Sequence, residues 1–181
     1  MRKILVAGAT GAMGKQLLPR LVAAGHEVVG TTSTDTKREL IRGLGATPAV
    51  MDGLDREAVV KVVTQAEPDI IVHQMTALSG PIDLRHFDRT FELTNRLRTE
   101  GTDNLLAAAR ETGVHKFVAQ SFAGWPSART GGPVKTEDDD LDLNPAAPFR
   151  TTLAAIRHLE EAVTGAEWIC LLYTSPSPRD S

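Results

Sequence analysis

Residues 3–14 read Lys-Ile-Leu-Val-Ala-Gly-Ala-Thr-Gly-Ala-Met-Gly. The apolar run at their start is typical of a short strand that is buried on both faces. From Ala12 onward, apolar residues recur at spacings of three and four, which is the pattern of an amphipathic helix. The stretch therefore predicts a strand, a glycine-rich turn and a helix, in that order.

The glycine-rich turn has the spacing of a dinucleotide-binding loop. Gly8 permits the tight turn, Gly11 lets the backbone approach a pyrophosphate, and Gly14 lets the helix pack closely on the sheet. The first N–H groups of the helix and the positive end of its dipole would then hold the phosphates. The residues expected to bind the cofactor here are Gly8, Thr10, Gly11, Ala12, Met13 and Gly14.

The rest of the chain continues the alternation of strands and helices. Further strands are expected at 26–32, 49–51, 69–73, 116–120 and from Trp168 onward. Further helices are expected from a capping box at 36–39, from a cap at Asp55, and over 88–112 and 149–164, with a long loop at 123–148. Such alternation forces parallel pairing and right-handed crossovers. The fold class is therefore α/β, a Rossmann-type doubly wound parallel sheet with helices on both faces.

The composition of the 181 residues excludes several classes of protein. With 41% hydrophobic and 24% charged residues, the chain suits one globular domain rather than a disordered segment. It has no apolar run near the roughly 18 residues of a membrane span and no signal peptide, so we expect a cytoplasmic protein without a membrane partner. A net charge of −3 argues against nucleic acid as a partner. One cysteine and five scattered histidines show no metal-ligand spacing, so no metal is expected.

The end of the chain differs from the rest. From Cys170 to Asp180 it becomes rich in Ser and Pro, and it resembles a transposon-type sequencing adapter read in frame. We therefore expect residues 1–169 to be an incomplete nucleotide-binding domain and residues 170–181 to be a non-native tail. The alternative is a native flexible terminus, in which case Tyr173 becomes a candidate functional residue.

Four motifs, taken together, resemble one family. They are the Gly-x-x-Gly-x-x-Gly loop at 8–14, Asp-x-x-Asp at 52–55, Gly-Thr-x-Asn-Leu-Leu at 101–106 and Gly-Val-x-x-Phe-Val at 113–118. The chain resembles the NAD(P)-dependent epimerase/dehydratase family, the extended or atypical short-chain dehydrogenase/reductases, over residues 1–169. The resemblance implies a nicotinamide cofactor and a small-molecule substrate, and it leaves open a homodimer of the full-length protein. It also implies that a C-terminal lobe, which sets the substrate, is missing.

The resemblance places further residues at the cofactor. Asp52, with Gly53 beside it, stands where the family contacts the adenine. The residues after the fourth expected strand stand where the family lines the nicotinamide ribose; they are Met75, Thr76 and Ala77.

The end of the second expected strand bears on the choice between NAD and NADP. An NAD site calls for an acid there, to bind the ribose 2′-hydroxyl. Thr32 occupies that place and Ser33 follows it, while Lys37 and Arg38 stand close enough to meet a 2′-phosphate. The sequence therefore favours NADP(H), and the nearby Asp35 leaves NAD(H) open.

The sequence departs from the family at the catalytic residues. The family combines a Tyr-x-x-x-Lys pair with a Ser or Thr after the fifth strand. Ser121 stands near that place and could polarise a substrate carbonyl, although an ungapped count puts Phe122 there. Thr152 and Ile156 stand at the Tyr and Lys places, or, with a shift of one, Leu153 and Arg157.

Two functions follow from this departure. The first is an NAD(P)-dependent oxidoreductase or epimerase-like enzyme that acts on a small carbonyl or sugar-like substrate. The second is a cofactor-binding sensor without turnover, because the missing pair removes the family's proton donor. Ser121 and the long loop at 123–148 favour the enzyme.

Overall fold

The computed structural model describes residues 1–78, 87–122, 127–128, 130, 132, 134–136, 139 and 142–171. Six strands form one sheet in the order β3-β2-β1-β4-β5-β6. They are β1 (Lys3–Ala7), β2 (Glu27–Thr32), β3 (Thr47–Val50), β4 (Ile70–His73), β5 (Lys116–Ala119) and β6 (Cys170–Leu171). Every neighbouring pair is parallel, which confirms the predicted doubly wound topology.

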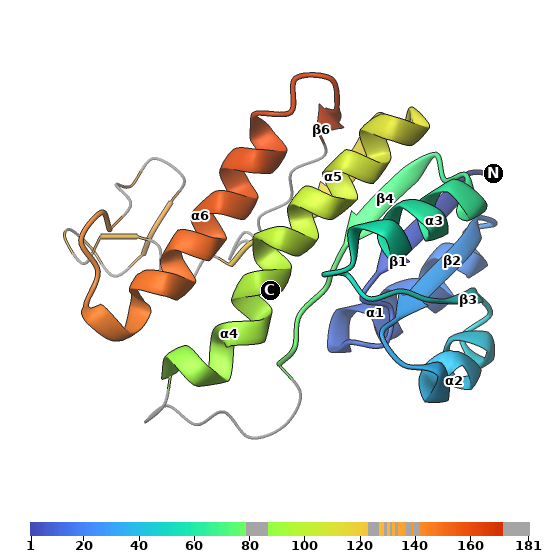
Figure 1. Ribbon diagram of the computed structural model, residues 1–181, viewed down its shortest axis with the longest axis horizontal. Helices are drawn as coiled ribbons and strands as arrows, with labels where there is room; N and C mark the ends of the chain where they lie inside the picture. The colour runs from blue at the N-terminus through green and yellow to red at the C-terminus, as the bar shows by residue number, and fades with distance from the viewer. Residues whose placement is uncertain are drawn as a thin grey trace.

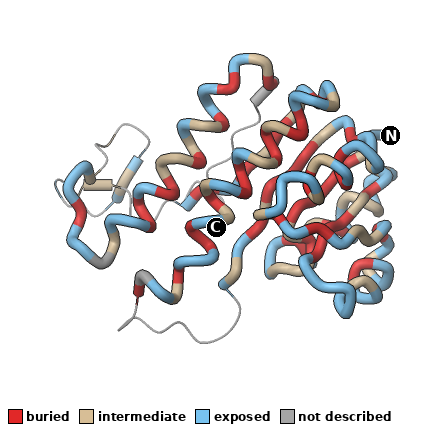
Figure 2. Tube along the Cα trace, viewed as in Figure 1, coloured by how far each residue is buried: buried red, intermediate tan, exposed pale blue. Residues whose placement is uncertain are grey.

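Helices cover both faces of this sheet (Figure 1). They are α1 (Ala12–Ala23), α2 (Arg38–Gly43), α3 (Arg56–Ala66), α4 (Phe87–Arg98), α5 (Glu100–Thr112) and α6 (Arg150–Thr164), with short 3-10 helices η1 (Asp35–Lys37) and η3 (Ala147–Phe149). Alternate residues of β1 face opposite sides, so Val6 packs with the α1 and α2 side chains and Leu5 with those of α3, α5 and α6. Figure 2 shows the buried stripes of α5 and α6.

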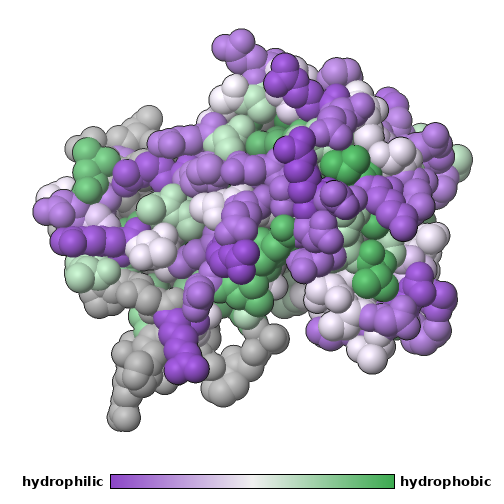
Figure 3. All heavy atoms as spheres, in the orientation of Figure 1, coloured by the Kyte–Doolittle hydropathy of each residue, from purple (hydrophilic) through white to green (hydrophobic). Residues whose placement is uncertain are grey.

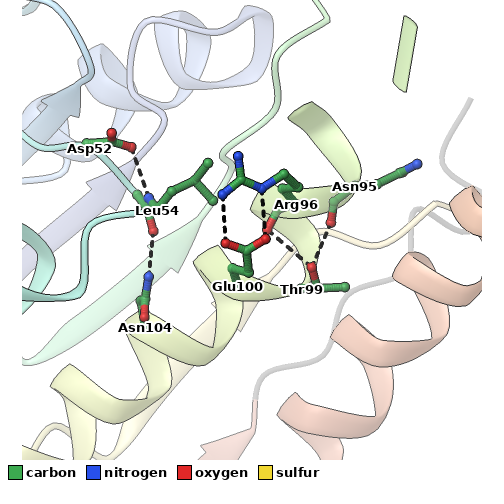
Figure 4. Close-up of polar contacts among 8 residues, drawn as sticks. Asp52, Leu54, Asn95, Arg96, Thr99, Glu100 and Asn104 are labelled. Carbon is green, nitrogen blue, oxygen red and sulfur yellow. Dashed lines mark hydrogen bonds and ion pairs between the residues drawn. The ribbon is translucent and has the colours of Figure 1, made fainter. Parts of the chain in front are cut away.

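The helix expected over 88–112 is two helices, α4 and α5. Thr99 separates them with backbone angles of φ −93° and ψ −85°, outside the helical region. Its hydroxyl donates to the Asn95 carbonyl oxygen at 3.1 Å, a local bond that competes with regular helix geometry. The Arg96–Glu100 ion pair spans the junction on its exposed side (Figure 4).

The two predicted helix caps have different outcomes. Asp55 caps α3 as predicted, because its carboxylate accepts the N–H groups of Glu57 and Ala58 at 3.0 and 3.2 Å. The prediction that a capping box at Thr36 starts the helix is wrong. Thr36 lies inside η1, and its hydroxyl donates to the Thr34 hydroxyl at 3.3 Å. The residue before α2, Lys37, makes no side-chain cap, since the turn of 3-10 helix already leads into α2.

The sixth strand begins at Cys170 rather than at Trp168. The preceding residues form a turn, in which the Ile169 N–H donates to the Ala166 carbonyl oxygen at 2.9 Å. In β6, Cys170 pairs with Lys116 of β5 through the backbone. Backbone pairing does not depend on side-chain identity, so the expected non-native origin of 170–181 stays a prediction. Tyr173 lies outside the described residues, as do the other residues from 172 onward.

Within the described ranges, no helix combines the length and apolar character that crossing a membrane requires. The same ranges contain no cluster of three or more His, Cys, Asp or Glu side chains arranged to hold a metal ion. Hydrophilic residues cover most of the face shown in Figure 3, and the hydrophobic residues among them form small separate patches.

Candidate nucleotide-binding and active site

The predicted site residues follow strands whose carboxyl ends meet at one edge of the sheet. Ala7 of β1 pairs with His73 of β4, and His73 pairs with Ala119 of β5. The order of the strands reverses between β1 and β4, which is where open α/β sheets bind their ligands. The glycine-rich loop, the segment after β4 and Ser121 therefore emerge side by side.

The glycine-rich loop is fixed to its neighbours by contacts that only glycine permits. Gly8 has a φ of +89°, and a Cβ on it would lie 2.5 Å from the Gln74 carbonyl oxygen. Its N–H donates to the Thr31 hydroxyl at 3.2 Å, and the Ala9 N–H donates to the Thr31 carbonyl oxygen at 3.0 Å. The loop is thereby held between β2 and the segment that follows β4.

The N-terminus of α1 has the character of an anion site. Gly11 is the cap residue and offers no side chain to the free N–H groups, and no acidic residue lies in the first turn. The first bond back to this cap comes from Lys15, so the N–H groups of residues 12–14 have no acceptor within the helix. Gly14 sits against the loop, where a Cβ would lie 2.5 Å from the Ala9 carbonyl oxygen. These groups fit the pyrophosphate of a dinucleotide.

The predicted adenine-side residues lie in the turn after β3. Asp52 is exposed, and its carboxylate accepts the Leu54 N–H at 3.0 Å. The Asn104 amide of α5 donates to the Gly53 carbonyl oxygen at 3.0 Å, as Figure 4 shows. A Cβ on Gly53 would lie 2.6 Å from the Met75 sulfur, so this turn packs directly on the segment after β4. Sequence reasoning missed the role of Asn104, although the residue belongs to the motif at 101–106.

The segment after β4 carries the other predicted cofactor residues. Met75 is buried against the turn just described, whereas Thr76 is exposed. The Ala77 N–H donates to the hydroxyl of Thr94 at 3.1 Å, which ties this segment to α4. The structure thus brings the three predicted residues to the sheet edge beside the inner face of α4.

The end of β2 carries no carboxylate. Thr32 is buried, and its hydroxyl accepts the Thr34 N–H at 3.3 Å. Ser33 and Lys37 are exposed, while the Arg38 guanidinium forms a 3.1 Å ion pair with Asp35. The argument for NADP(H) relied on a neutral residue at this strand end and on the positive charges of Lys37 and Arg38. The strand end is neutral, but Asp35 neutralises the charge of Arg38.

Ser121 reaches the sheet edge, and its hydroxyl donates to the Glu160 carboxylate of α6. This proton is therefore directed at a carboxylate rather than at free space, and its use on a substrate carbonyl requires the hydroxyl to rotate. The catalytic role of Ser121 stays a prediction.

Three of the four candidate positions of the missing Tyr-Lys pair are buried, and the fourth, Arg157, is partly buried. Thr152 is fully buried and accepts a hydrogen bond from the Asn95 amide at 3.0 Å, and Ile156 is also buried. With the alternative alignment, Leu153 is buried and Arg157 donates to the Asp142 carbonyl oxygen at 3.3 Å. Neither alignment places a proton donor of the Tyr-Lys kind on α6.

His73 at the end of β4 is a buried residue whose two ring nitrogens both have hydrogen-bond partners. Its Nδ1 accepts the Met75 N–H at 3.2 Å, so Nε2 carries the proton and donates to the Thr102 hydroxyl at 3.1 Å. Burial lowers the pKa of His73 to about 4; the Arg98 charge acts in the same direction, and a backbone hydrogen bond at Leu97 opposes both. The neutral imidazole therefore anchors β4 to α5 through its hydrogen bonds. It carries no second proton near neutral pH, so it cannot serve as a general acid there.

Comparison with characterised proteins gives consistent matches. The chain is 39% identical over 171 residues to a 3-diazoavenalumate denitrifying reductase from a Streptomyces species, covering 91% of this chain and 52% of that protein. It is 30% identical over 159 residues to a UDP-glucose 4-epimerase of Mycolicibacterium smegmatis, covering 81% of this chain and 46% of that protein. The chain thus spans about half the length of the curated relatives it matches.

Solved structures show the same fold. The UDP-Glc/GlcNAc 4-epimerase of Campylobacter jejuni superposes with a TM-score of 0.73 at 22% identity, over 91% of this chain and 49% of that one. The Thermus thermophilus UDP-glucose 4-epimerase in complex with NAD gives a TM-score of 0.69 at 23% identity, over 90% of this chain and 51% of that one. The sequence profile of one family matches residues 4–176. With the loop, the sheet order and these matches in agreement, the chain belongs to the NAD dependent epimerase/dehydratase family.

Proposed function

We propose that this chain forms the cofactor-binding part of an NAD(P)-dependent reductase. The observation that carries the proposal is the loop at 8–14, which presents the free N–H groups of α1 at the switch point of the sheet. A nicotinamide cofactor held there supplies a hydride. The residues of the chain hold the dinucleotide through this loop, support the adenine side through Asp52, and border the nicotinamide side through Met75–Ala77.

The reaction class follows from the absence of a Tyr-Lys pair. Reduction of a carbonyl to an alcohol needs a proton as well as a hydride. Reductive loss of dinitrogen from an aryl diazonium needs the hydride alone: the hydride pair forms the new C–H bond, and the C–N bonding pair leaves with N₂. The substrate is thereby reduced and the reduced cofactor is oxidised. A 39% identical relative carries the name 3-diazoavenalumate denitrifying reductase, which combines a diazo compound with a reductase. We therefore infer a substrate whose reduction needs no protein acid.

The cofactor is NADP(H) in this proposal. The neutral Thr32 does not repel a 2′-phosphate, and Lys37 is exposed at the end of η1, which follows this strand. The Arg38–Asp35 pair is at the surface, where ion pairs contribute only about 0–1 kcal/mol, so a phosphate can compete for the guanidinium.

Binding of the two cofactors tests this preference. NADPH and NADH are titrated against the chain by fluorescence, and NADPH should bind more tightly. Lys37→Ala should weaken NADPH binding and leave NADH binding unchanged. Arg42→Ala is the matched control, because Arg42 is an exposed cation in the last turn of α2, five residues after Lys37, and pairs with Glu39. Equal affinities, or tighter NADH, would contradict the NADP preference, and no binding of either cofactor would contradict the proposed function.

Turnover tests the reaction class. The complete open reading frame of the gene is assayed with NADPH deuterated at the transferred position, using a 2-diazophenol and benzaldehyde as probes. Deuterium should appear on the ring carbon that carried nitrogen, and benzaldehyde should not be reduced. Tight NADPH binding without turnover of either probe would support the sensor instead, and reduction of benzaldehyde alone would contradict the inferred substrate class.

A further inference from the structure

Arg98, the last residue of α4, is a buried cation without a counter-charge among the described residues. It is only 8% exposed, and within the described part of the chain its Nη1 has no hydrogen-bond partner. Desolvation by burial lowers the pKa of Arg98, and no described carboxylate opposes this shift. The exposed Arg96, in contrast, has its pKa raised by its hydrogen bond to Glu100. A buried charge is unfavourable unless something pairs with it. Its surroundings among the described residues do not supply that partner.

A second unsatisfied group lies one turn earlier on the same face of α4. Asn95 is 4% exposed, and its Nδ2 donates to the Thr152 hydroxyl of α6 at 3.0 Å, while its Oδ1 finds no partner in the described part of the chain. Figure 4 shows its side chain directed away from the Arg96–Glu100 pair. A threonine hydroxyl can donate as well as accept. A half-turn of the amide therefore keeps the bond to Thr152 and offers an N–H where the free oxygen now lies.

The turns of α4 that carry these two residues border the nicotinamide end of the proposed cofactor site, and the Arg98 charge acts on His73 at the end of β4. Thr94, adjacent to Asn95, holds the Ala77 N–H of the segment after β4. The carbonyl oxygen of Arg98 accepts the hydroxyl of Thr102, which in turn contacts His73 at the end of β4. The phosphates have a separate place at the N-terminus of α1, so the unsatisfied Nη1 of Arg98 remains for another ligand.

We propose that Arg98, assisted by Asn95, binds a carboxylate of the substrate. This inference rests on the proposed function and narrows its substrate class to carboxylic acids. The planar guanidinium fork matches a carboxylate with two parallel hydrogen bonds, and one carboxylate balances one buried cation. Binding of the anion thereby removes the unfavourable unpaired charge on Arg98.

The experiment uses cinnamate and its neutral analogue cinnamamide as probes, with NADPH present. Their affinities for the chain are measured by calorimetry for the wild type, Arg98→Met and Arg98→Lys. Cinnamate binding should weaken at least about tenfold in Arg98→Met and less in Arg98→Lys, since lysine keeps the charge without the fork. Cinnamamide should bind equally weakly to all three proteins. Arg96→Met, the exposed neighbour, is the matched control and should bind cinnamate as the wild type does.

Thermal unfolding of the free proteins gives a second readout. Methionine removes an unpaired buried charge and fills similar volume, so Arg98→Met should melt at or above the wild-type temperature. A lower melting temperature, failure to fold, or unchanged cinnamate binding in Arg98→Met would overturn the carboxylate site. Wild-type protein that binds NADPH but not cinnamate would overturn the site and leave the proposed function standing. Failure to bind NADPH would overturn the proposed function itself.

Discussion

Replacing His73 by asparagine should remove a pH-dependent part of the stability. The imidazole is 2% exposed, and its pKa is about 4 in the folded protein against an ordinary value of 6.5. As the pH falls below 6.5 the unfolded chain takes up a proton on this side chain, while the folded chain does so only near pH 4. Stability therefore falls as the pH is lowered through this window. The linkage amounts to about 2 kcal/mol between pH 7 and pH 5.

The assay is urea unfolding of the wild type and His73→Asn at pH 7, 6 and 5. Asparagine can accept the Met75 N–H but does not reach Thr102 as the imidazole does, so the variant should be less stable at pH 7 by about 1 kcal/mol or more. The difference between the two proteins should then shrink, or change sign, toward pH 5. His115→Asn, at an exposed histidine, is the control and should follow the wild-type pH dependence.

A constant difference between wild type and His73→Asn from pH 7 to pH 5 would refute the reasoning. It would mean that the imidazole takes up its proton as readily in the folded chain as in the unfolded one. A difference that grows toward pH 5 would refute it more strongly, because it would require a charged imidazole stabilised by the fold.

Two further predictions concern the elements that build the site. Gly14→Ala should destabilise the chain by about 1–3 kcal/mol and weaken NADPH binding, because the new Cβ would meet the Ala9 carbonyl oxygen at 2.5 Å. In the control variant Gly43→Ala, no atom lies within 4 Å of the new Cβ. Its stability and its NADPH affinity should therefore equal or exceed those of the wild type. Thermal melts and cofactor titrations measure both quantities. Asp55→Ala should lower the free energy of unfolding, measured with urea, by about 1 kcal/mol, because the α3 cap is lost. Asp55→Asn should retain most of that stability, and an equal loss in both variants would contradict the cap.

Much of the fold is encoded in short stretches of sequence. These signals concern residues that are close together in the sequence. They are the apolar run at 3–7, the glycines at 8–14 and the helix cap at Asp55. Strands and helices that alternate in this way admit few topologies, because parallel strands need crossovers of one hand. The parallel, doubly wound sheet therefore follows the prediction, and its strand order β3-β2-β1-β4-β5-β6 places the loop at the switch point.

The sequence by itself determined the fold class, the glycine-rich loop and the absence of a Tyr-Lys pair, since each is a property of neighbouring residues or of residue type. Only the tertiary structure decided the partners of polar side chains that are far apart in the chain. The Ser121–Glu160 bond depends on how α6 packs against the end of β5, and the Asn95–Thr152 bond depends on how α4 packs against α6. The lack of a counter-charge at Arg98 among the described residues depends likewise on the surroundings that the fold gives to α4. Periodicity predicts which face of a helix is buried, but hydrogen bonds and desolvation depend on which atoms meet there.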